Sequence, residues 1–403
     1  MIRITKGREH WLLAFGMVLA VSCSTIPKAS DPSLQITQAG VFSLRFVTSR
    51  ALELEPCGCS MRPLGGIDRE WNWLHSSKST APAAFNFTSG LTFIPNPYQE
   101  DLKTYASSKA DFMLEALNQL NTHGISPAAA DFTLGMKRIK ELQAHSHFPW
   151  ISANLVDSTT HALLFERFHQ YGDKTLPIFV TGISHSAPRI SEVATLPPEQ
   201  AMQEVVQRLP AGPKLLIVLS TLSPADRDHL LALFPQINFM VGDNEEAGSH
   251  DLEIKGPNSY IVNPASRGRG IAVVDLKLLP TPGGSPAFLP LYADESAAVI
   301  ANQRTQDQRD LTRVEELLKE NKIKRKEKAN LLKTRQELST RLAKTAEIAV
   351  TPPSTGSVIN YSVVDLDSEF AVPRNSLTEL IERFKKTVHD EAVNEGTEHS
   401  ANP

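Results

Sequence analysis

Cysteine is scarce in this sequence, and its scarcity narrows the chemistry that the chain can carry. Only three cysteines occur among 403 residues, at positions 23, 57 and 59. No C-x-x-C-H run is present, which excludes covalent attachment of a c-type haem. Cys57 and Cys59 supply only half of the four ligands of a usual zinc site, so a metal ion there would need a distant histidine as well.

Long apolar runs and an excess of positive charge are lacking too. After the apolar run of residues 11–21, no stretch has the roughly 20 apolar residues that a membrane-spanning helix needs. The formal net charge is −4, so the composition provides no general attraction to nucleic acid. We therefore expect neither a protein with several membrane spans nor a nucleic-acid partner.

The N-terminus has the pattern of a bacterial export signal, with basic residues before a short apolar run and small residues after it. Ala20-Val21-Ser22-Cys23 resembles the lipobox of bacterial lipoproteins, in which the cysteine becomes the acylated N-terminus. We expect a signal peptide over residues 1–22, lipid on Cys23 and a tether over residues 23–39. Ordinary secretion, with Cys23 as a bystander, is the alternative.

The residue after the lipobox cysteine bears on location. Ser24, rather than aspartate, resembles lipoproteins that are sorted to the outer membrane. The expected location is the bacterial cell envelope, on an outer membrane facing the periplasm or the cell surface, with the membrane contacted through the N-terminal lipid. In this oxidising compartment, Cys57 and Cys59 are expected to form a local disulfide or to stay a thiol pair.

Residues 40–280 alternate short apolar runs with amphipathic stretches, a pattern that indicates a layered α/β domain. Ser223 before Pro224 predicts a helix start, because serine caps the free N–H groups and proline suits the first helical position. Strands are expected at 41–49, 83–89, 149–155, 176–184, 214–220, 237–243, 259–264 and 270–278, and helices at 105–121, 134–144, 198–209 and 224–233.

A Pro/Gly-rich linker at 281–296 precedes a helical arm at 297–350 that contains neither glycine nor proline. Its apolar seam is polar in the middle, which favours two helices that turn back near residues 321–328, or one long helix lying partly on the main domain. Between residues 304 and 347 there are 13 Lys/Arg and 8 Asp/Glu, a net charge of +5. The arm is either a solvated face or a surface for a protein partner.

The C-terminal segment, residues 351–403, is expected to contain a strand at 358–366, a helix at 376–391 and a frayed tail. Two shorter motifs have structural interpretations. Asn154 is expected to be a buried hydrogen-bonding residue. The run ASRGRG at 265–270 is expected to form a structural turn, with phosphate binding by its arginines as the alternative.

The stretch Glu55–Glu70, EPCGCSMRPLGGIDRE, resembles a segment of exported bacterial relatives of the 5'-nucleotidase group of calcineurin-like metallophosphoesterases. Residues 40–279 keep the order of segments of that superfamily. The resemblance implies an α/β fold, a four-layer αββα sandwich with a two-metal site at the strand ends.

The positions that hold the metal ligands in that superfamily are degenerate in this sequence. A dinuclear site needs several anionic or imidazole ligands, including a bridging carboxylate, and leucine and alanine supply none. Residues 41–56, which include the first expected strand, contain neither the Asp nor the His of the first motif. The degenerate positions are Thr88 and Leu91 in the second motif, Ala129, Ala130 and Asp131 in the third, Thr221 in the fourth, and Asp243 and Glu245 in the fifth.

The loss of ligands leads to an expectation of binding without catalysis. We expect no catalytic residue and no cofactor, or at most one weakly held divalent cation at Asp131, Asp243 or Glu245. The main hypothesis is an envelope lipoprotein whose degenerate domain binds a ligand or a protein partner. The alternatives are a divergent metal-dependent phosphoesterase of the 5'-nucleotidase kind and a structural envelope protein that uses its arm.

Overall fold

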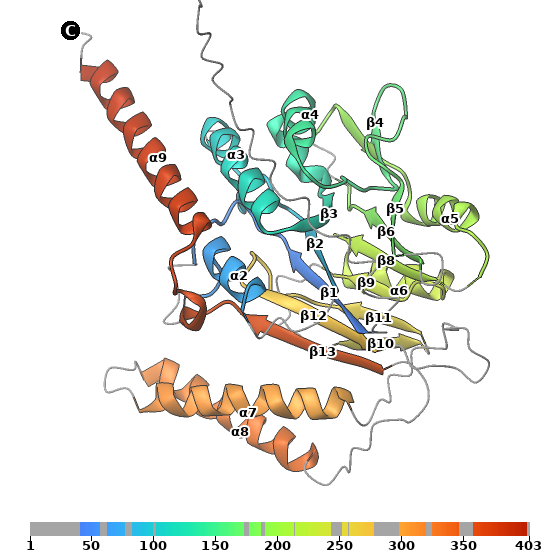
Figure 1. The fold of residues 1–403 in the computed structure, drawn as a ribbon, viewed down its shortest axis with the longest axis vertical. Helices are drawn as coiled ribbons and strands as arrows, with labels where there is room; N and C mark the ends of the chain where they lie inside the picture. The colour runs from blue at the N-terminus through green and yellow to red at the C-terminus, as the bar shows by residue number, and fades with distance from the viewer. Residues whose placement is uncertain are drawn as a thin grey trace, which may run out of the picture. The chain divides into compact units, whose positions relative to one another are not determined.

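Two mixed β-sheets lie at the centre of the fold (Figure 1). The computed structural model describes residues 41–56, 63–76, 83–99, 102–172, 177–186, 190–212, 214–242, 252–256, 258–277, 298–319, 325–345 and 358–400. All of these residues belong to one compact unit, Asp31–Pro403. The signal peptide, Cys23, the tether, the 281–296 linker, Cys57 and Cys59, and Asp243 and Glu245 lie outside the described residues.

The first sheet has the strand order β13-β12-β1-β2-β3. Its three parallel strands, β1 to β3, come from the start of the chain, and β12 and β13 add to the β1 side in antiparallel fashion. The C-terminal segment is therefore part of this sheet. The strand bounds are β1 Val41–Thr48, β2 Ala84–Gly90, β3 Thr122–Pro127, β12 Gly270–Lys277 and β13 Val358–Asp365.

The second sheet has the strand order β10-β11-β9-β8-β6-β5, with four parallel strands between antiparallel edges. A separate two-stranded ladder joins β4 to β7. The strand bounds are β4 Leu155–Asp157, β5 Phe168–Gly172, β6 Pro177–Ile183, β7 Val193–Thr195, β8 Leu215–Ser220, β9 Phe239–Val241, β10 Glu253–Gly256 and β11 Ser259–Val262.

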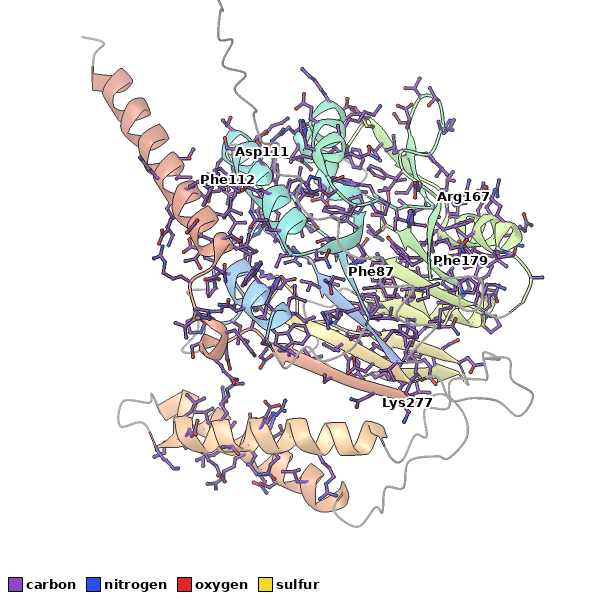
Figure 2. The ribbon with its side chains drawn as sticks, viewed as in Figure 1. Phe87, Asp111, Phe112, Arg167, Phe179 and Lys277 are labelled. Carbon is purple, nitrogen blue, oxygen red and sulfur yellow. The ribbon has the colours of Figure 1, made fainter. Side chains whose placement is uncertain are left out.

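The core between the sheets follows from the two-residue period of the strands. Phe42, Leu44 and Phe46 alternate along β1 and meet apolar side chains of the second sheet. Phe87 belongs to this core, whereas Phe179 packs against the helices on the far side of the second sheet (Figure 2). Burying one such side chain stabilises the fold by about 1.5–3 kcal/mol.

Helices cover the outer faces of both sheets. Helices α3, α4 and α9 pack on the first sheet in one apolar cluster, and α5 and α6 pack on the second sheet in another. This arrangement confirms the predicted four-layer sandwich. The bounds are α2 Ile67–Leu74, α3 Lys103–Gln119, η2 Ala129–Leu134, α4 Met136–His145, α5 Pro198–Arg208, α6 Pro224–Leu233, η3 Ser368–Phe370 and α9 Ser376–Ser400.

The arm consists of two helices, α7 (Ala298–Leu318) and α8 (Arg325–Thr345), which contact each other. Helix α7 also contacts β13 (Figure 1). Its Arg313 bridges two carboxylates, with Nη1 3.2 Å from Asp365 Oδ2 and Nη2 2.8 Å from Asp367 Oδ2. Within the described part of the chain, no helix combines the length and apolar character needed to cross a bilayer.

One predicted strand, 149–155, is wrong over most of its length. Trp150 and Ile151 form only isolated bridges, and β4 starts at Leu155. The segment crosses between the sheets: Ile151 N–H donates to Ile125 of the first sheet, whereas Ala153 N–H donates to Gly182 of the second. The crossing buries the apolar side chains of this segment. Its sequence is therefore as apolar as that of a buried strand, although the segment forms no regular ladder.

We predict that Arg313→Gln loosens the arm, because the substitution removes both bridges from α7 to the segment 365–367. A charge-assisted pair of this kind contributes about 1 kcal/mol. Amide hydrogen exchange in α7 should accelerate roughly fivefold, the equivalent of that free energy. Arg335→Gln, at an exposed position on α8, is the matched control. Equal exchange in both variants would contradict the bridging role.

Candidate functional site

The strand ends of the two sheets bring most of the predicted site positions together. Gly90 at the end of β2 lies beside Pro127 at the end of β3. Leu91 follows β2 directly, and Ala129, Ala130 and Asp131 open the short helix η2 after β3. Carboxyl ends of parallel strands are the usual place for ligand sites in α/β folds. This edge is therefore the candidate site.

A chain of hydrogen bonds connects the two sheets across this edge. Ala129 N–H donates to Ser184 Oγ over 2.8 Å, and Ser184 follows β6. Ser184 Oγ lies 3.4 Å from Thr221 Oγ1, which also accepts a hydrogen bond from His185 N–H over 2.7 Å. The positions predicted from the third and fourth motifs are thus linked through Ser184.

Asn154 fixes that serine in place. Ser184 N–H donates to Asn154 Oδ1, and Asn154 Nδ2 donates to the Ser184 carbonyl, both over 2.8 Å. Asn154 is fully buried. The predicted buried hydrogen-bonding role of Asn154 is confirmed.

Asp131 is fully buried, and its carboxylate accepts hydrogen bonds from the backbone. Oδ1 accepts from Phe93 N–H over 2.7 Å and from Thr92 N–H over 3.0 Å, and Oδ2 accepts from Ala128 N–H over 3.1 Å. Burial raises the pKa of the Asp131 carboxyl to about 7, and the backbone donors oppose that rise. In this arrangement Asp131 holds the loops after β2 and β3 together.

Three of the predicted positions have side chains without any metal-binding atom. Leu91 and Ala130 pack against the apolar cluster beneath the helices, and Ala129 is buried within it. A bridging ligand between two divalent ions must be an oxygen atom, which none of these side chains offers. Ala129 is part of the core, and Leu91 and Ala130 are partly buried against it.

A buried ion pair occupies the start of this edge. Arg50, just after β1, and Glu70 on α2 are 3% and 5% exposed. Arg50 Nη1 and Nη2 lie 2.6 and 2.8 Å from the two carboxylate oxygens of Glu70. Arg50 Nε lies 3.4 Å from Thr88 Oγ1. A guanidinium with a bidentate carboxylate therefore contacts the position that the second motif assigns to an acid.

The backbone after β1 is unusual as well. Ser49, Ala51 and Leu52 have φ angles of 42°, 47° and 57°, values that non-glycine residues rarely adopt. Their N–H groups donate to the carbonyls of residues 89, 91 and 92. The loop therefore follows the chain after β2 closely, and this contact presents Arg50 to Thr88.

The predicted turn at 265–270 is confirmed as a structural element. Arg267 Nη1 lies 2.8 Å from Glu53 Oε1, and Arg267 Nη2 donates to the Asn96 carbonyl over 2.8 Å. Gly268 N–H donates to the Thr48 carbonyl at the end of β1. Arg267 is thus engaged in contacts within the protein.

The donors in the described part of the chain do not fit a two-metal centre. Among those residues, no three His, Cys, Asp or Glu side chains lie close enough to share a metal ion. The one acidic residue of the predicted set that is described, Asp131, has its oxygens engaged by backbone N–H groups.

Comparison with known proteins gives matches in structure alone. No family model matches the sequence, and no curated protein matches it. A calcineurin-like phosphoesterase, YfkN from Bacillus subtilis, aligns over 86% of this chain and 97% of its own, with 14% identity and a TM-score of 0.53. The sulfate thiohydrolase SoxB of Thermus thermophilus aligns over 59% of this chain and 54% of its own, with 16% identity and a TM-score of 0.50.

A 5'-nucleotidase precursor of Thermus thermophilus has 18% identity and a TM-score of 0.48 over 59% of this chain and 52% of its own. The matched region thus spans about half the length of the thiohydrolase and of the nucleotidase. The matches to the phosphoesterase and the thiohydrolase show that this chain has the calcineurin-like phosphoesterase fold. The resemblance inferred from the sequence is confirmed at the level of fold.

We predict that Glu70→Gln destabilises the protein by about 3–5 kcal/mol, because the buried Arg50 charge loses its paired carboxylate. Urea unfolding monitored by circular dichroism measures the change. The double variant Arg50→Met with Glu70→Leu should lose less, since it buries no unpaired charge. Glu53→Gln, which breaks a more exposed pair with Arg267, is the control and should lose about 1 kcal/mol. A double variant that is less stable to urea than Glu70→Gln would refute this account.

We also predict a pH dependence from Asp131. The folded protein keeps the Asp131 proton up to about pH 7, whereas the unfolded chain releases it near the ordinary value of 3.8. The free energy of unfolding should therefore fall as the pH rises from about 4 to about 7, by up to about 4 kcal/mol from this group.

The substitution Asp131→Asn isolates this contribution, because asparagine does not titrate. Its stability should be lower at pH 4 and should show less decline toward pH 7. Asp111→Asn, at an exposed position on α3, leaves the Asp131 titration in place and serves as the control. A slope in Asp131→Asn as steep as in the control would count against the assignment.

Proposed function

We propose that this protein uses a phosphoesterase fold for binding and does not hydrolyse phosphate esters. The observation that carries the proposal is the Arg50–Glu70 pair beside Thr88. In the resemblance, Thr88 stands where an acidic residue belongs to the metal site. A guanidinium is a permanent cation, and it stands close to where a divalent cation would have to sit.

The side chains around that pair support the same proposal. Leu91 and Ala130 pack into the apolar cluster, so restoring ligands there would require the core to be repacked. Asp131 joins two loops through backbone hydrogen bonds. The described part of the strand-end edge is thus stabilised by contacts within the protein.

We further propose that binding takes place in the bacterial cell envelope. The lipobox-like Ala20-Val21-Ser22-Cys23 supports a lipid anchor on Cys23, and the basic arm supports a protein partner through residues 297–350. In this proposal the N-terminal lipid holds the protein at a membrane, and the folded domain binds its ligand or partner there.

Metal analysis and a turnover assay test the absence of catalysis together. Protein purified without chelator is analysed for Mn, Zn and Fe, and then incubated with each of these ions and a set of nucleotides and p-nitrophenyl phosphate. We expect less than stoichiometric metal and no phosphate release above a blank. Stoichiometric metal with turnover would overturn the proposal.

The same assay separates the alternative of a divergent phosphoesterase, which the fold similarity keeps open. Any turnover found should be re-measured in a variant with Asp243→Asn and Glu245→Gln. Loss of turnover in this variant would identify the fifth-motif acids as the functional ones. Turnover that persists would exclude these two acids as the active site.

A further inference from the structure

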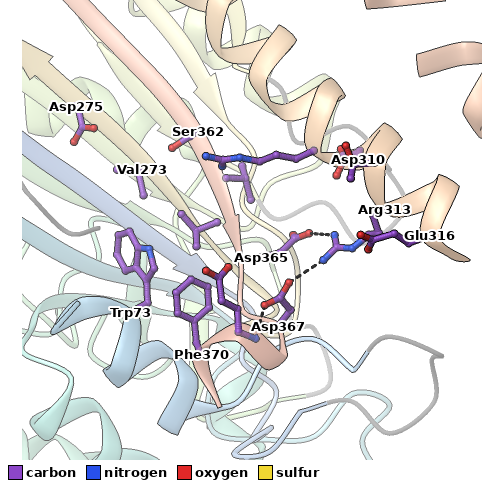
Figure 3. Close-up of a pocket in the computed structure, with 15 residues that line it drawn as sticks. Trp73, Val273, Asp275, Asp310, Arg313, Glu316, Ser362, Asp365, Asp367 and Phe370 are labelled. Atoms are coloured by element: carbon purple, nitrogen blue, oxygen red, sulfur yellow. Dashed lines mark hydrogen bonds and ion pairs between the residues drawn. The ribbon is translucent and has the colours of Figure 1, made fainter. Parts of the chain in front are cut away.

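A pocket of about 680 Å³ lies on the outer face of the first sheet, away from the candidate site described above. One wall is helix α7 of the arm, and the other is formed by β12, β13 and the turn η3 (Figure 3). Ligand pockets in proteins commonly have volumes of about 300–1,000 Å³. The pocket is therefore large enough for a small organic molecule.

The inner end of the pocket is apolar and aromatic. Trp73, Val273 and Phe370 line it and belong to one small apolar cluster (Figure 3). Trp73 is only 4% exposed, and the guanidinium of Arg45 lies 5.1 Å from the centre of its ring. An aromatic ring that attracts one cation provides a surface on which the aliphatic part of a second, mobile cation can lie.

The polar walls are predominantly acidic. Six carboxylates and two guanidinium groups line the pocket, which gives the lining a formal charge of −4. One of the two arginines, Arg313, bridges Asp365 and Asp367 (Figure 3). A concave surface lined mainly by charge of one sign concentrates ions of the opposite sign.

An independent observation comes from the strand next to this face. Ser43 on β1 is directly opposite Asp275, a lining residue on β12. Ser43 is 1% exposed, and its hydroxyl has no hydrogen-bond partner among the described residues. Because Phe42 and Leu44 face the inter-sheet core, Ser43 shares the outer face with Asp275. Ser43 does not line the pocket itself, so its hydroxyl marks polar character beside the wall and is not a contact for the ligand.

We propose that this pocket binds an organic cation, a molecule with ammonium or guanidinium groups on an aliphatic chain. The carboxylates accept hydrogen bonds from its charged ends, and the surface around Trp73 and Phe370 contacts its methylene groups. This inference does not depend on the proposed function, since it concerns a different surface and holds whether or not the strand-end site is catalytic.

Titration calorimetry of the full-length protein with spermidine tests the proposal, at constant ionic strength. Glu316 lines the pocket from α7 and is exposed, so Glu316→Gln should leave the fold intact while weakening binding. Glu315, its exposed neighbour, does not line the pocket, and Glu315→Gln is the matched control. We expect saturable binding that weakens roughly threefold in Glu316→Gln and stays unchanged in Glu315→Gln.

A second variant and a second probe make the outcome decisive. Glu316→Lys should weaken spermidine binding more than Glu316→Gln, because it also places a cation at the wall. Octane-1,8-diol has a similar aliphatic length without charge and should not compete. Absence of saturable binding, equal effects in the Glu315 and Glu316 variants, or competition by the diol would each overturn the proposal.

Discussion

The fold depends on one constraint: polar groups that end up between two apolar sheets must find partners inside the protein. An unpartnered buried donor or acceptor destabilises a fold by about 1–3 kcal/mol. The strand ends meet this demand with side chains of their own. Asp131 accepts from three backbone N–H groups, and Ser184 joins Ala129 to the second sheet. The loops at this edge take their positions from these bonds.

The same constraint explains how the described residues hold the strand ends of this fold together. In a metal site, cations balance the buried carboxylates and hold the loops. Here Arg50 balances Glu70, and the amides of residues 92 and 93 meet a carboxylate. Apolar residues such as Leu91 then complete the packing. Among the described residues, this edge therefore takes its structure from an ion pair, backbone hydrogen bonds and apolar packing.

Sequence patterns predicted the parts of the fold whose signals are local. Helix α6 begins at Pro224 as expected, because Ser223 Oγ accepts the Asp226 N–H at its start. Periodicity alone did not predict strand β3, since Thr122–Pro127 has one large apolar residue between polar residues, glycine and proline. The short helix α2 was missed too: it starts after Gly66 without a side-chain cap.

The sequence predicted where the candidate site lies. It predicted only some of the contacts between the side chains there. The motif positions from Thr88 to Thr221 do gather at one edge, as the resemblance implied. The Arg50–Glu70 pair was not foreseen, because no periodicity relates a residue after a strand to one on a later helix. Its single hint was the acidic residue that closes the EPCGCSMRPLGGIDRE stretch. The pocket beside α7 depends on how the arm docks, which the linear sequence does not encode locally.

The place of β13 has a consequence for how the molecule comes into being. Strand β12 is paired on both sides, by β1 from the start of the chain and by β13 from near its end. A nascent chain lacking residues 358–365 would therefore expose β12 as an edge strand. Its unpaired amide and carbonyl groups could then pair with another chain. The first sheet cannot be completed until residues 358–365 have been synthesised. Pairing between strands that are far apart in the sequence is also slow.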